Sequence, residues 1–170
     1  MTITIKPISI KHAQAFHQAL DQVARERRYL LLLEAPPLEQ IEQLVRYNIE
    51  RNTVHFVAVD GNKMVGWCDI RPYTLPGMTH SGELGMAVVA EYRGRGLGHR
   101  LLEATVNQSL ANGLSRIELE VFASNQVAKA LYEKLGFEQE GVKRRARYLD
   151  GVWDDLIMMA LLKPTNPPAN

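Results

Sequence analysis

Apolar and polar positions along the 170-residue chain follow two rhythms, and the change from one to the other marks the predicted elements. Apolar residues at every second position predict a half-buried strand, whereas apolar residues three and four apart predict one face of a helix. The first half of the chain thus contains a strand, two helices and a two-stranded hairpin. In chain order these are a strand ending at Pro7, a helix that starts after Ser9 and runs out in 29–33, a helix over 38–49 after Pro36 and Pro37, and strands over 54–59 and 64–70 joined by the turn 60–63.

The second half of the chain alternates strands and helices again and ends in a long hairpin. A strand–helix–strand crossover in its middle makes the class mixed α and β. We expect residues 1–163 to form one domain and 164–170, with three prolines and no core residue, to form a flexible tail. The predicted elements are a loop at 73–81, a strand over 83–89, a helix from the glycine-rich loop 92–98 to about Asn112, a strand over 117–122, a helix over 126–135 capped by Ser124 or Asn125, and a hairpin over 137–163 that turns at Asp150-Gly151.

Composition narrows the class of protein further. With 46% hydrophobic and 23% charged residues the chain is ordinary globular protein, and its 20 basic and 19 acidic residues leave a formal net charge of +1. So small an excess of charge gives no reason to expect nucleic acid or a membrane as partner. The N-terminus has no signal-peptide pattern, no apolar run approaches a membrane span, and the lone Cys68 cannot form an internal disulfide. We therefore expect a cytoplasmic protein.

The segment with the clearest chemical signal is the loop 92–98, which follows a strand and opens a helix. Its glycines let backbone N–H groups approach a ligand closely, and the start of a helix favours an anion, so the loop fits a phosphate or pyrophosphate. A Walker loop is excluded because no Gly-Lys-Ser/Thr follows, and the dinucleotide fingerprint fails because its third glycine position is His99. A glycine-rich turn that merely enters a helix is the alternative.

Two blocks of sequence together resemble the GNAT superfamily of acetyl-CoA-dependent N-acetyltransferases. Arg93-Gly94-Arg95-Gly96-Leu97-Gly98 resembles its Arg/Gln-x-x-Gly-x-Gly/Ala signature, and 117–137 resembles its strand, Asn and Ala-x-x-Leu-Tyr-x-x-Leu-Gly-Phe block. The terminal hairpin is similar to the branch of phosphinothricin-type, L-amino-acid and ribosomal-protein acetyltransferases. The resemblance implies a central mixed sheet of about seven strands flanked by about four helices, and often a homodimer.

The resemblance also implies where acetyl-CoA binds as co-substrate. The family pairs its fourth strand with the pantetheine arm through backbone groups, and it binds the pyrophosphate with the amides of the glycine loop. We expect the side chains of Met86 and Val88 to be core, and Asn125 can cap a helix as well as contact CoA. The positions that match cofactor contacts are Met86, Val88, Arg93, Gly94, Arg95, Gly96, Leu97, Gly98, His99, Asn125 and Tyr132.

Acetyl transfer to an amine needs a base for the amine proton, donors for the oxyanion and an acid for the departing thiolate. Tyr132 matches the family's general acid; otherwise it is a half-buried aromatic on a helix face. For the base, Glu83 matches an acidic position in phosphinothricin-type relatives, while Glu118 and Glu120 lie on the neighbouring predicted strand. Strand glutamates are otherwise simply solvated. The five histidines lack metal-ligand spacing, so no metal is expected.

The resemblance therefore implies an N-acetyltransferase that moves an acetyl group from acetyl-CoA to a primary amine by direct transfer in a ternary complex. We expect a small amine or amino acid as acceptor, bound by the loop between the first two helices, including 29–33, the loop 71–82 and the terminal hairpin. The basic run 143–147 could attract an acidic substrate or be a solvated strand. The alternatives are acetylation of a protein N-terminus and a non-catalytic protein that binds acyl-CoA for regulation.

Overall fold

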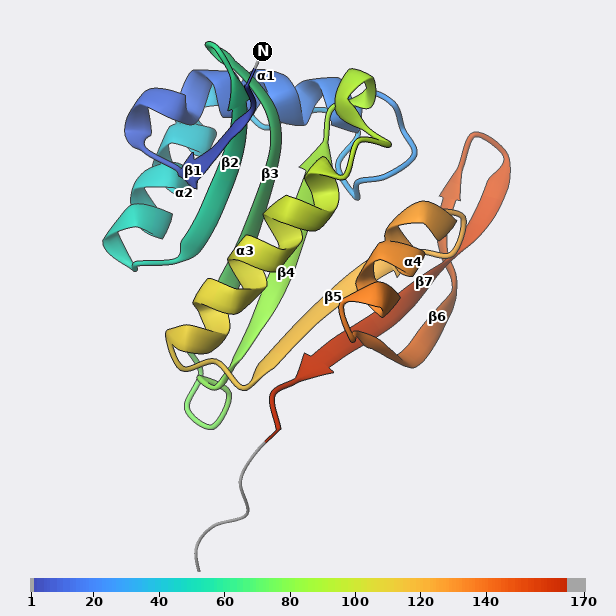
Figure 1. Ribbon diagram of the computed structural model, residues 1–170. Coiled ribbons are helices and arrows are strands. Elements are labelled where there is room, and N and C mark those ends of the chain that lie inside the picture. The colour runs from blue at the N-terminus through green and yellow to red at the C-terminus, as the bar shows by residue number, and fades with distance from the viewer. Residues whose placement is uncertain (1, 165–170) are drawn as a thin grey trace, which may run out of the picture. The chain divides into compact units, whose positions relative to one another are not determined.

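The computed structural model describes residues 2–164, and in this part of the chain seven strands form one sheet in the order β1-β2-β3-β4-β5-β7-β6 (Figure 1). Strands β4 and β5 pair in parallel, whereas β5 with β7 and β7 with β6 pair antiparallel. This confirms the mixed seven-stranded sheet. The strands are β1 (Thr4–Pro7), β2 (Val54–Asp60), β3 (Lys63–Pro72), β4 (Ser81–Val88), β5 (Arg116–Phe122), β6 (Glu138–Leu149) and β7 (Val152–Leu162). The helices are α1 (Ala13–Ala24), α2 (Leu38–Glu50), α3 (Leu97–Ala111) and α4 (Gln126–Lys134), with short 3-10 turns η1 (Ile10–His12) and η2 (Ala90–Tyr92).

The chain divides into two compact units. Within the described residues the first contains 2–71 and 85–106, and the second contains 72–84 and 107–164. Strand β4 contributes its second half to the first unit and its first half to the second. The single domain expected over 1–163 stays a prediction, and the expected tail lies, beyond Pro164, outside the described residues.

Helices α1 and α2 cover one face of the sheet in the first unit. The Phe16 ring of α1 meets the Trp67 ring of β3 edge-on at 5.3 Å and the His55 ring of β2 at 5.2 Å. Val45 of α2 is fully buried in the same cluster. Burial of such side chains supplies most of the stabilisation of a fold of this kind.

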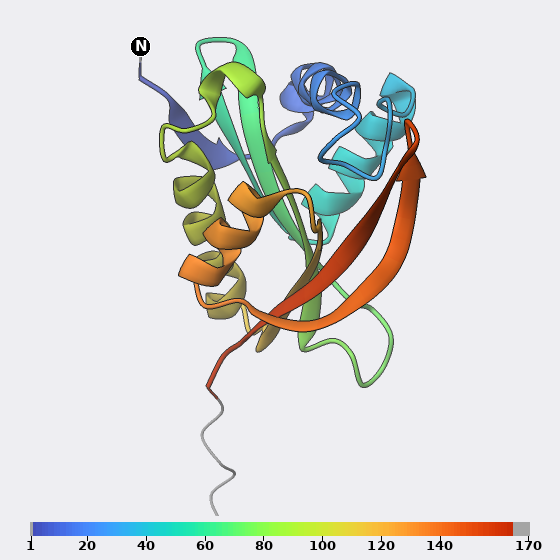
Figure 2. The same cartoon turned by 90° about the vertical axis from the view of Figure 1, so that its right-hand side faces the viewer.

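Helix α3 covers the opposite face of the first unit, and Figure 2 shows the sheet edge-on between the two helical layers. The approach is close at Gly66 of β3, where a Cβ atom would lie 3.0 Å from Leu101 Cδ1. Thr105, fully buried one turn further on, donates its hydroxyl to the Leu101 carbonyl at 2.7 Å. A side chain at position 66 would push away the helix that begins at the glycine-rich loop.

The first helix ends earlier than its apolar pattern predicts. It stops at Ala24, and Arg27 lies in the left-handed region at φ 56°, where the helical hydrogen bonds cannot continue. The run 29–33 is a loop, so the prediction that the helix runs out there is wrong. Asp21 Oδ1 accepts a hydrogen bond from the Ala35 amide at 2.9 Å, which folds this loop back onto α1.

In the second unit, β5, β7 and β6 form an antiparallel layer, with α4 over one side of it (Figure 1). Gly136 ends α4 at φ 92°, where a Cβ atom would meet Leu161 of β7 at 3.3 Å. The predicted turn at Asp150-Gly151 is confirmed, with both residues at positive φ, 52° and 79°. Strand β6 is irregular, with shifts of register between Gln139 and Gly141 and between Lys143 and Arg147.

Candidate active site

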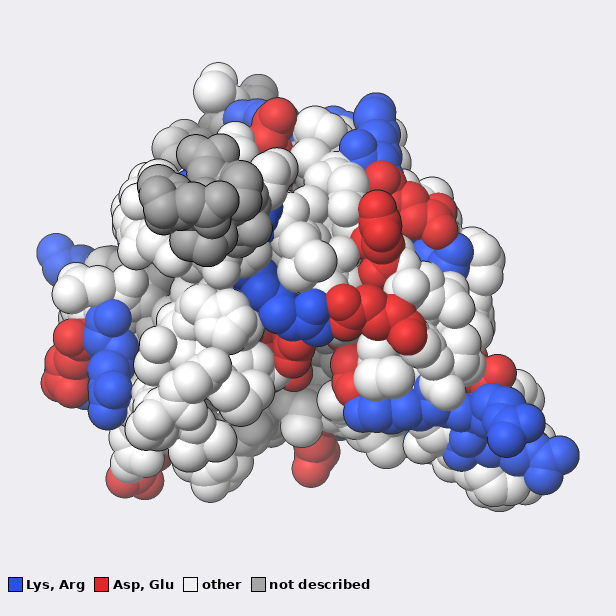
Figure 3. Space-filling view, turned by 90° about the horizontal axis from the view of Figure 1, so that it is seen from below, with Lys and Arg blue, Asp and Glu red and all other residues white. Residues whose placement is uncertain are grey.

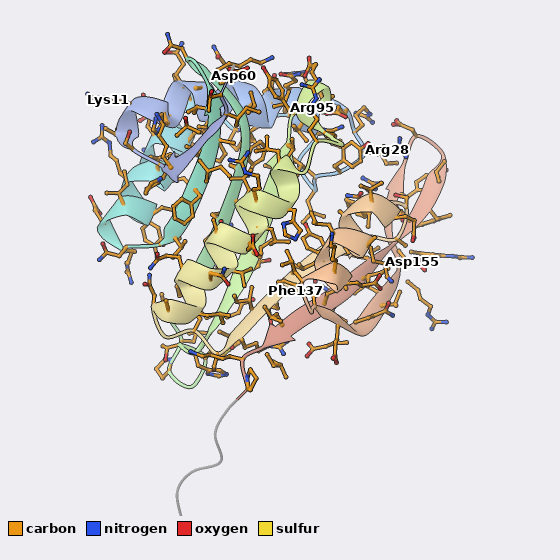
Figure 4. All side chains as sticks on the ribbon, viewed as in Figure 1. Lys11, Arg28, Asp60, Arg95, Phe137 and Asp155 are labelled. Carbon is orange, nitrogen blue, oxygen red and sulfur yellow. The ribbon has the colours of Figure 1, made fainter. Side chains whose placement is uncertain are left out.

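The glycine-rich loop connects β4 to α3 in the first unit. Gly94 and Gly96 lie at φ 71° and 75°, and a Cβ atom at either position would meet nothing within 4 Å. Helix α3 starts at Leu97, so its first N–H groups have no partner inside the helix and its dipole favours an anion there. Arg95 lies in the same loop (Figure 4). The loop therefore offers backbone donors and positive charge to a phosphate group.

Hydrogen bonds to the sheet hold this loop in place. The Val89 amide donates to the Val65 carbonyl at 2.9 Å, so the chain is still attached to β3 just before the loop. The Tyr92 hydroxyl donates to Asp60 at 3.0 Å, and this hydrogen bond raises the pKa of Tyr92 above its usual value. Both contacts fix the backbone of the loop before any ligand binds, which lowers the entropy cost of binding.

Arg93 contacts protein groups on every side of its guanidinium. Its Nε donates to the Val88 carbonyl at 2.7 Å, and its two terminal nitrogens donate to Glu26 at 2.8 and 2.6 Å. The guanidinium also lies 4.5 Å from the centre of the Tyr29 ring. The ion pair with Glu26 raises the pKa of Arg93. The side chain that the sequence assigned to cofactor binding thus joins the end of β4 to the segment after α1.

The other predicted cofactor positions of the first unit make weaker contacts with protein groups than Arg93 does. The Arg95 guanidinium lies 5.8 Å from the Tyr92 ring, and His99 Nδ1 is 3.9 Å from a Glu103 carboxylate oxygen. Met86 and Val88 are half-buried, so their side chains are less enclosed than the core positions that we expected. Gly98 follows Leu97 in the first turn of α3.

In the second unit, α4 carries both of the positions that the second sequence block predicted. Asn125 caps the helix, because its side chain accepts a hydrogen bond from the Ala128 amide at 3.3 Å. The capping part of the prediction is confirmed. Tyr132, in the last turn of α4, is 7% exposed, and its ring centre lies 5.8 Å from that of Phe137.

Glu83 and Glu118 are register partners on the parallel strands β4 and β5, so their Cα atoms lie side by side. Glu118 accepts hydrogen bonds from the Tyr73 hydroxyl at 2.5 Å and from Arg116 Nε at 3.0 Å. Arg116 also donates to both oxygens of Glu140, which raises the pKa of Arg116 and lowers that of Glu140. Two donors, the Tyr73 hydroxyl and Arg116 Nε, thus hold the Glu118 side chain in place.

Glu120 lies two residues further along β5, on the same face of the sheet as Glu118. Its partner is Lys143 of β6, whose ammonium donates to a carboxylate oxygen of Glu120. The Glu120 side chain is 30% exposed. The expected sharing of a face by Glu118, Glu120 and Phe122 is confirmed, because they pair with Ala160, Met158 and Leu156 of β7.

Sequence reasoning missed a contact that connects the turn before α4 to the terminal hairpin. Asp154 of β7 accepts hydrogen bonds from the Ser124 hydroxyl at 2.5 Å and from Arg147 at 2.9 Å. Arg147 also lies 3.6 Å above the Phe122 ring. Only the register of β6 against β7 brings Arg147 opposite Asp154, and no sequence pattern gives that register.

Residues 2–164 contain no group of three or more His, Cys, Asp or Glu side chains arranged to hold a metal ion. No helix within the same range is both long and apolar enough to cross a bilayer.

Comparison with known proteins gives the family. Residues 15–137 match the sequence profile described as "Acetyltransferase (GNAT) family". An N-alpha-acetyltransferase of Saccharolobus solfataricus is 34% identical over 151 residues, which cover 83% of this chain and 86% of that protein. The [ribosomal protein bS18]-alanine N-acetyltransferase of Escherichia coli (strain K12) is 40% identical over 76 residues, 45% of this chain and 51% of that protein.

Among solved structures, a GNAT superfamily phosphinothricin acetyltransferase from Sinorhizobium meliloti, in complex with AcCoA, has the same fold. Its TM-score is 0.88 at 19% sequence identity, over 96% of this chain and 90% of that one. The chain therefore belongs to the GNAT family of acetyltransferases. Its fold, its glycine loop and its curated relatives agree that it is an N-acetyltransferase, an enzyme of the acyltransferase class.

Proposed function

We propose that this enzyme transfers an acetyl group from acetyl-CoA directly to a primary amine while both substrates are bound. The observation that carries the proposal is the loop with Gly94 and Gly96, open on its outer side and followed at once by the start of α3. Phosphate groups bind well at such helix starts. The AcCoA bound to the Sinorhizobium meliloti relative supports the choice of donor.

Acetyl-CoA fits the residues that are present. The loop amides from Gly94 to His99 would hold the pyrophosphate, with Arg95 as the nearby cation. The pantetheine arm, whose amides resemble a missing strand, would pair with the backbone of Met86 and Val88. In the first unit β4 is the last strand of the order β1-β2-β3-β4, which favours that pairing. Asn125 would contribute to CoA through the part of its amide that does not cap α4.

Direct transfer, without an acyl-enzyme, is supported by the state of Cys68. This thiol is fully buried on β3, and burial raises its pKa far above the physiological range. A thiol attacks a thioester as the thiolate, so Cys68 is a poor nucleophile. In the reaction that we propose, the amine nitrogen attacks the carbonyl carbon of acetyl-CoA, and the carbon–sulfur bond then breaks.

Two groups would handle the protons. Glu83 or Glu120 would accept the amine proton, directly or through water, and Tyr132 would protonate the departing thiolate. Tyr73 and Arg116 already donate to Glu118, the third acidic side chain of this region. Backbone N–H groups of β4 would stabilise the oxyanion.

The acceptor that we propose is a small amine or amino acid. A protein N-terminus is the second candidate, and the names of the archaeal and Escherichia coli relatives favour it. The two are separated by comparing free amino acids with peptides that present the same N-terminal residue.

Initial rates with both substrates varied test the direct mechanism. A ternary complex gives intersecting double-reciprocal lines, whereas a covalent acyl-enzyme gives parallel lines. Cys68→Ala should keep the intersecting pattern, and parallel lines that vanish in this variant would refute direct transfer. Glu83→Gln and Glu120→Gln identify the base, because its loss should remove the acidic limb of the pH–rate profile, and Glu118→Gln is the matched control on the same face.

We also propose that the enzyme works in the cytoplasm as a homodimer. The lone cysteine supports a reducing compartment, and the homodimer rests on the family resemblance. Light scattering after size-exclusion chromatography measures the mass in solution, and a single species of 19.2 kDa at micromolar concentration would refute the dimer.

A further inference from the structure

Strand β6 contains a bulge that presents two arginines. Lys143 pairs with Leu156 of β7 and Arg147 pairs with Asp154. Three residues of β6, 144–146, therefore lie opposite the single residue Asp155 of β7. Residues 144–146 have no register partner on β7. Arg145 adopts φ 51°, which is uncommon for a residue other than glycine. Bulges commonly re-aim side chains beside functional sites.

The bulge is fixed from β7. Asp155 Oδ1 accepts a hydrogen bond from the Arg145 amide at 2.7 Å, so the carboxylate binds backbone and holds the left-handed residue in place. The side chains of Arg144 and Arg145 line a pocket together with Asp155, which Figure 4 labels on the hairpin. Both arginines and Asp155 belong to the second unit.

Neither guanidinium in the pocket has a carboxylate partner in the part of the chain that the structure describes. The neighbouring cations differ, because Lys143 pairs with Glu120, and Arg147 pairs with Asp154. The Arg145 guanidinium lies 5.7 Å from the Trp153 ring instead. Figure 3 shows basic side chains gathered at the lower right, the side on which Figure 1 draws the hairpin.

We propose that Arg144 and Arg145 bind a carboxylate of the acceptor amine, and this inference rests on the proposed acetyl transfer. Arginine presents a planar fork of donors that matches a carboxylate, and two such forks with one nearby acid leave the pocket positive. Lys143, the residue before Arg144, contacts the candidate base Glu120.

The carboxylate could belong to a free amino acid or to an acidic residue of a peptide, and paired acceptors separate these sources. In one arm, free L-amino acids are compared with their carboxamides. In the other, tripeptide amides with Asp at the second position are compared with their Asn counterparts. Each pair removes one negative charge from an otherwise matched acceptor.

The test compares kcat/KM for wild type, Arg144→Gln and Arg145→Gln on each pair, with Arg46→Gln on the exposed surface of α2 as a control that removes the same charge. We expect wild type to prefer the acid of one pair by about tenfold or more, because hydrogen bonds to charged groups discriminate at least that strongly. Either pocket variant should abolish the preference, because it should lower kcat/KM on the acid much more than on the amide. Arg144→Lys should restore part of it.

A second readout does not depend on turnover. Trp153 is 54% exposed beside Arg145, whereas Trp67 is 4% exposed in the other unit, so the two indole N–H signals in an NMR spectrum report separately. Titration with the preferred acid, or with L-glutamate if no amine is acetylated, should shift the Trp153 signal in wild type and not in Arg144→Gln. Equal rates on acids and amides, or equal losses on both in the variants, would overturn the carboxylate site while acetyl transfer stands. A Trp153 shift without any acetylation would instead keep the site and refute the proposed function.

Discussion

Removing the guanidinium of Arg93 should destabilise the fold, and removing that of Arg95 should not. Both arginines belong to the glycine loop and both match the family signature. In the structure, however, Arg93 donates to the Val88 carbonyl and to both oxygens of Glu26, whereas Arg95 lies beside the Tyr92 ring. The pair of variants therefore separates a cation that supports the loop from a cation that is available to a ligand.

The size of the effect follows from these contacts. The hydrogen bond from Arg93 to the Val88 carbonyl is charge-assisted and about 1.5 to 3 kcal/mol in strength. The ion pair with Glu26 adds at most about 1 kcal/mol, because its side chains are 31% and 28% exposed. We expect Arg93→Ala to lower the free energy of unfolding by about 2 kcal/mol, which for a chain of this length lowers Tm by about 4 to 8 °C. Arg95→Ala should stay within about 0.5 kcal/mol of wild type.

Urea unfolding followed by circular dichroism measures the stability of both variants. Calorimetric titration with acetyl-CoA measures their affinity for this ligand. Arg95→Ala should weaken the binding of acetyl-CoA without lowering the free energy of unfolding. If Arg93→Ala unfolds at the same urea concentration as wild type, the reasoning about its supporting contacts is refuted.

Three further predictions concern other features. Burial lowers the pKa of His55 to about 4, whereas in the unfolded chain it is near 6.5. Between these two values the unfolded chain binds a proton at His55 that the folded chain does not bind. Stability should therefore be complete above about pH 7 and fall by about 2 kcal/mol by pH 5 in urea titrations, and His55→Gln should show a flatter dependence. Asn125→Ala should cost about 1 kcal/mol through loss of the α4 cap, whereas Asn125→Asp should keep most of that stability in the same urea assay and still bind CoA more weakly by calorimetry if the amide is a ligand. Gly96→Ala, at φ 75°, should cost about 1 to 2 kcal/mol in urea unfolding and raise the KM for acetyl-CoA, and an unchanged KM would argue against the loop as the phosphate site.

Local patterns were enough to predict most of the elements. Alternation of apolar residues located β1 and β5, and turn chemistry located Asp150-Gly151, because a two-residue hairpin of this type requires positive φ at both positions. The end of α1 could not be predicted in the same way. The apolar run 29–33 continues the pattern of a helix, and only the left-handed Arg27 and the contact of Asp21 with Ala35 show that the chain leaves it.

The candidate site was predictable as a set of positions but not as a set of contacts. The glycines and Asn125 follow from local backbone requirements, which a sequence motif records well. The partners of Arg93 and Glu118 come from residues 67 and 45 positions away, so only the folded chain brings them together. The bulge at 144–146 depends on the register of two strands, which the charges of the sequence do not determine.

Acetyl transfer itself is tested most directly by measuring thiol release from acetyl-CoA together with the acetylated amine, by mass spectrometry, across amino acids, polyamines, aminoglycosides and short peptides. The account predicts that at least one amine gives thiol and acetylated product in equal amounts, and that Tyr132→Phe slows this turnover by about 10²-fold or more while acetyl-CoA still binds. Binding of acetyl-CoA with no acetylated product from any amine would contradict the account and favour a protein that only binds acyl-CoA.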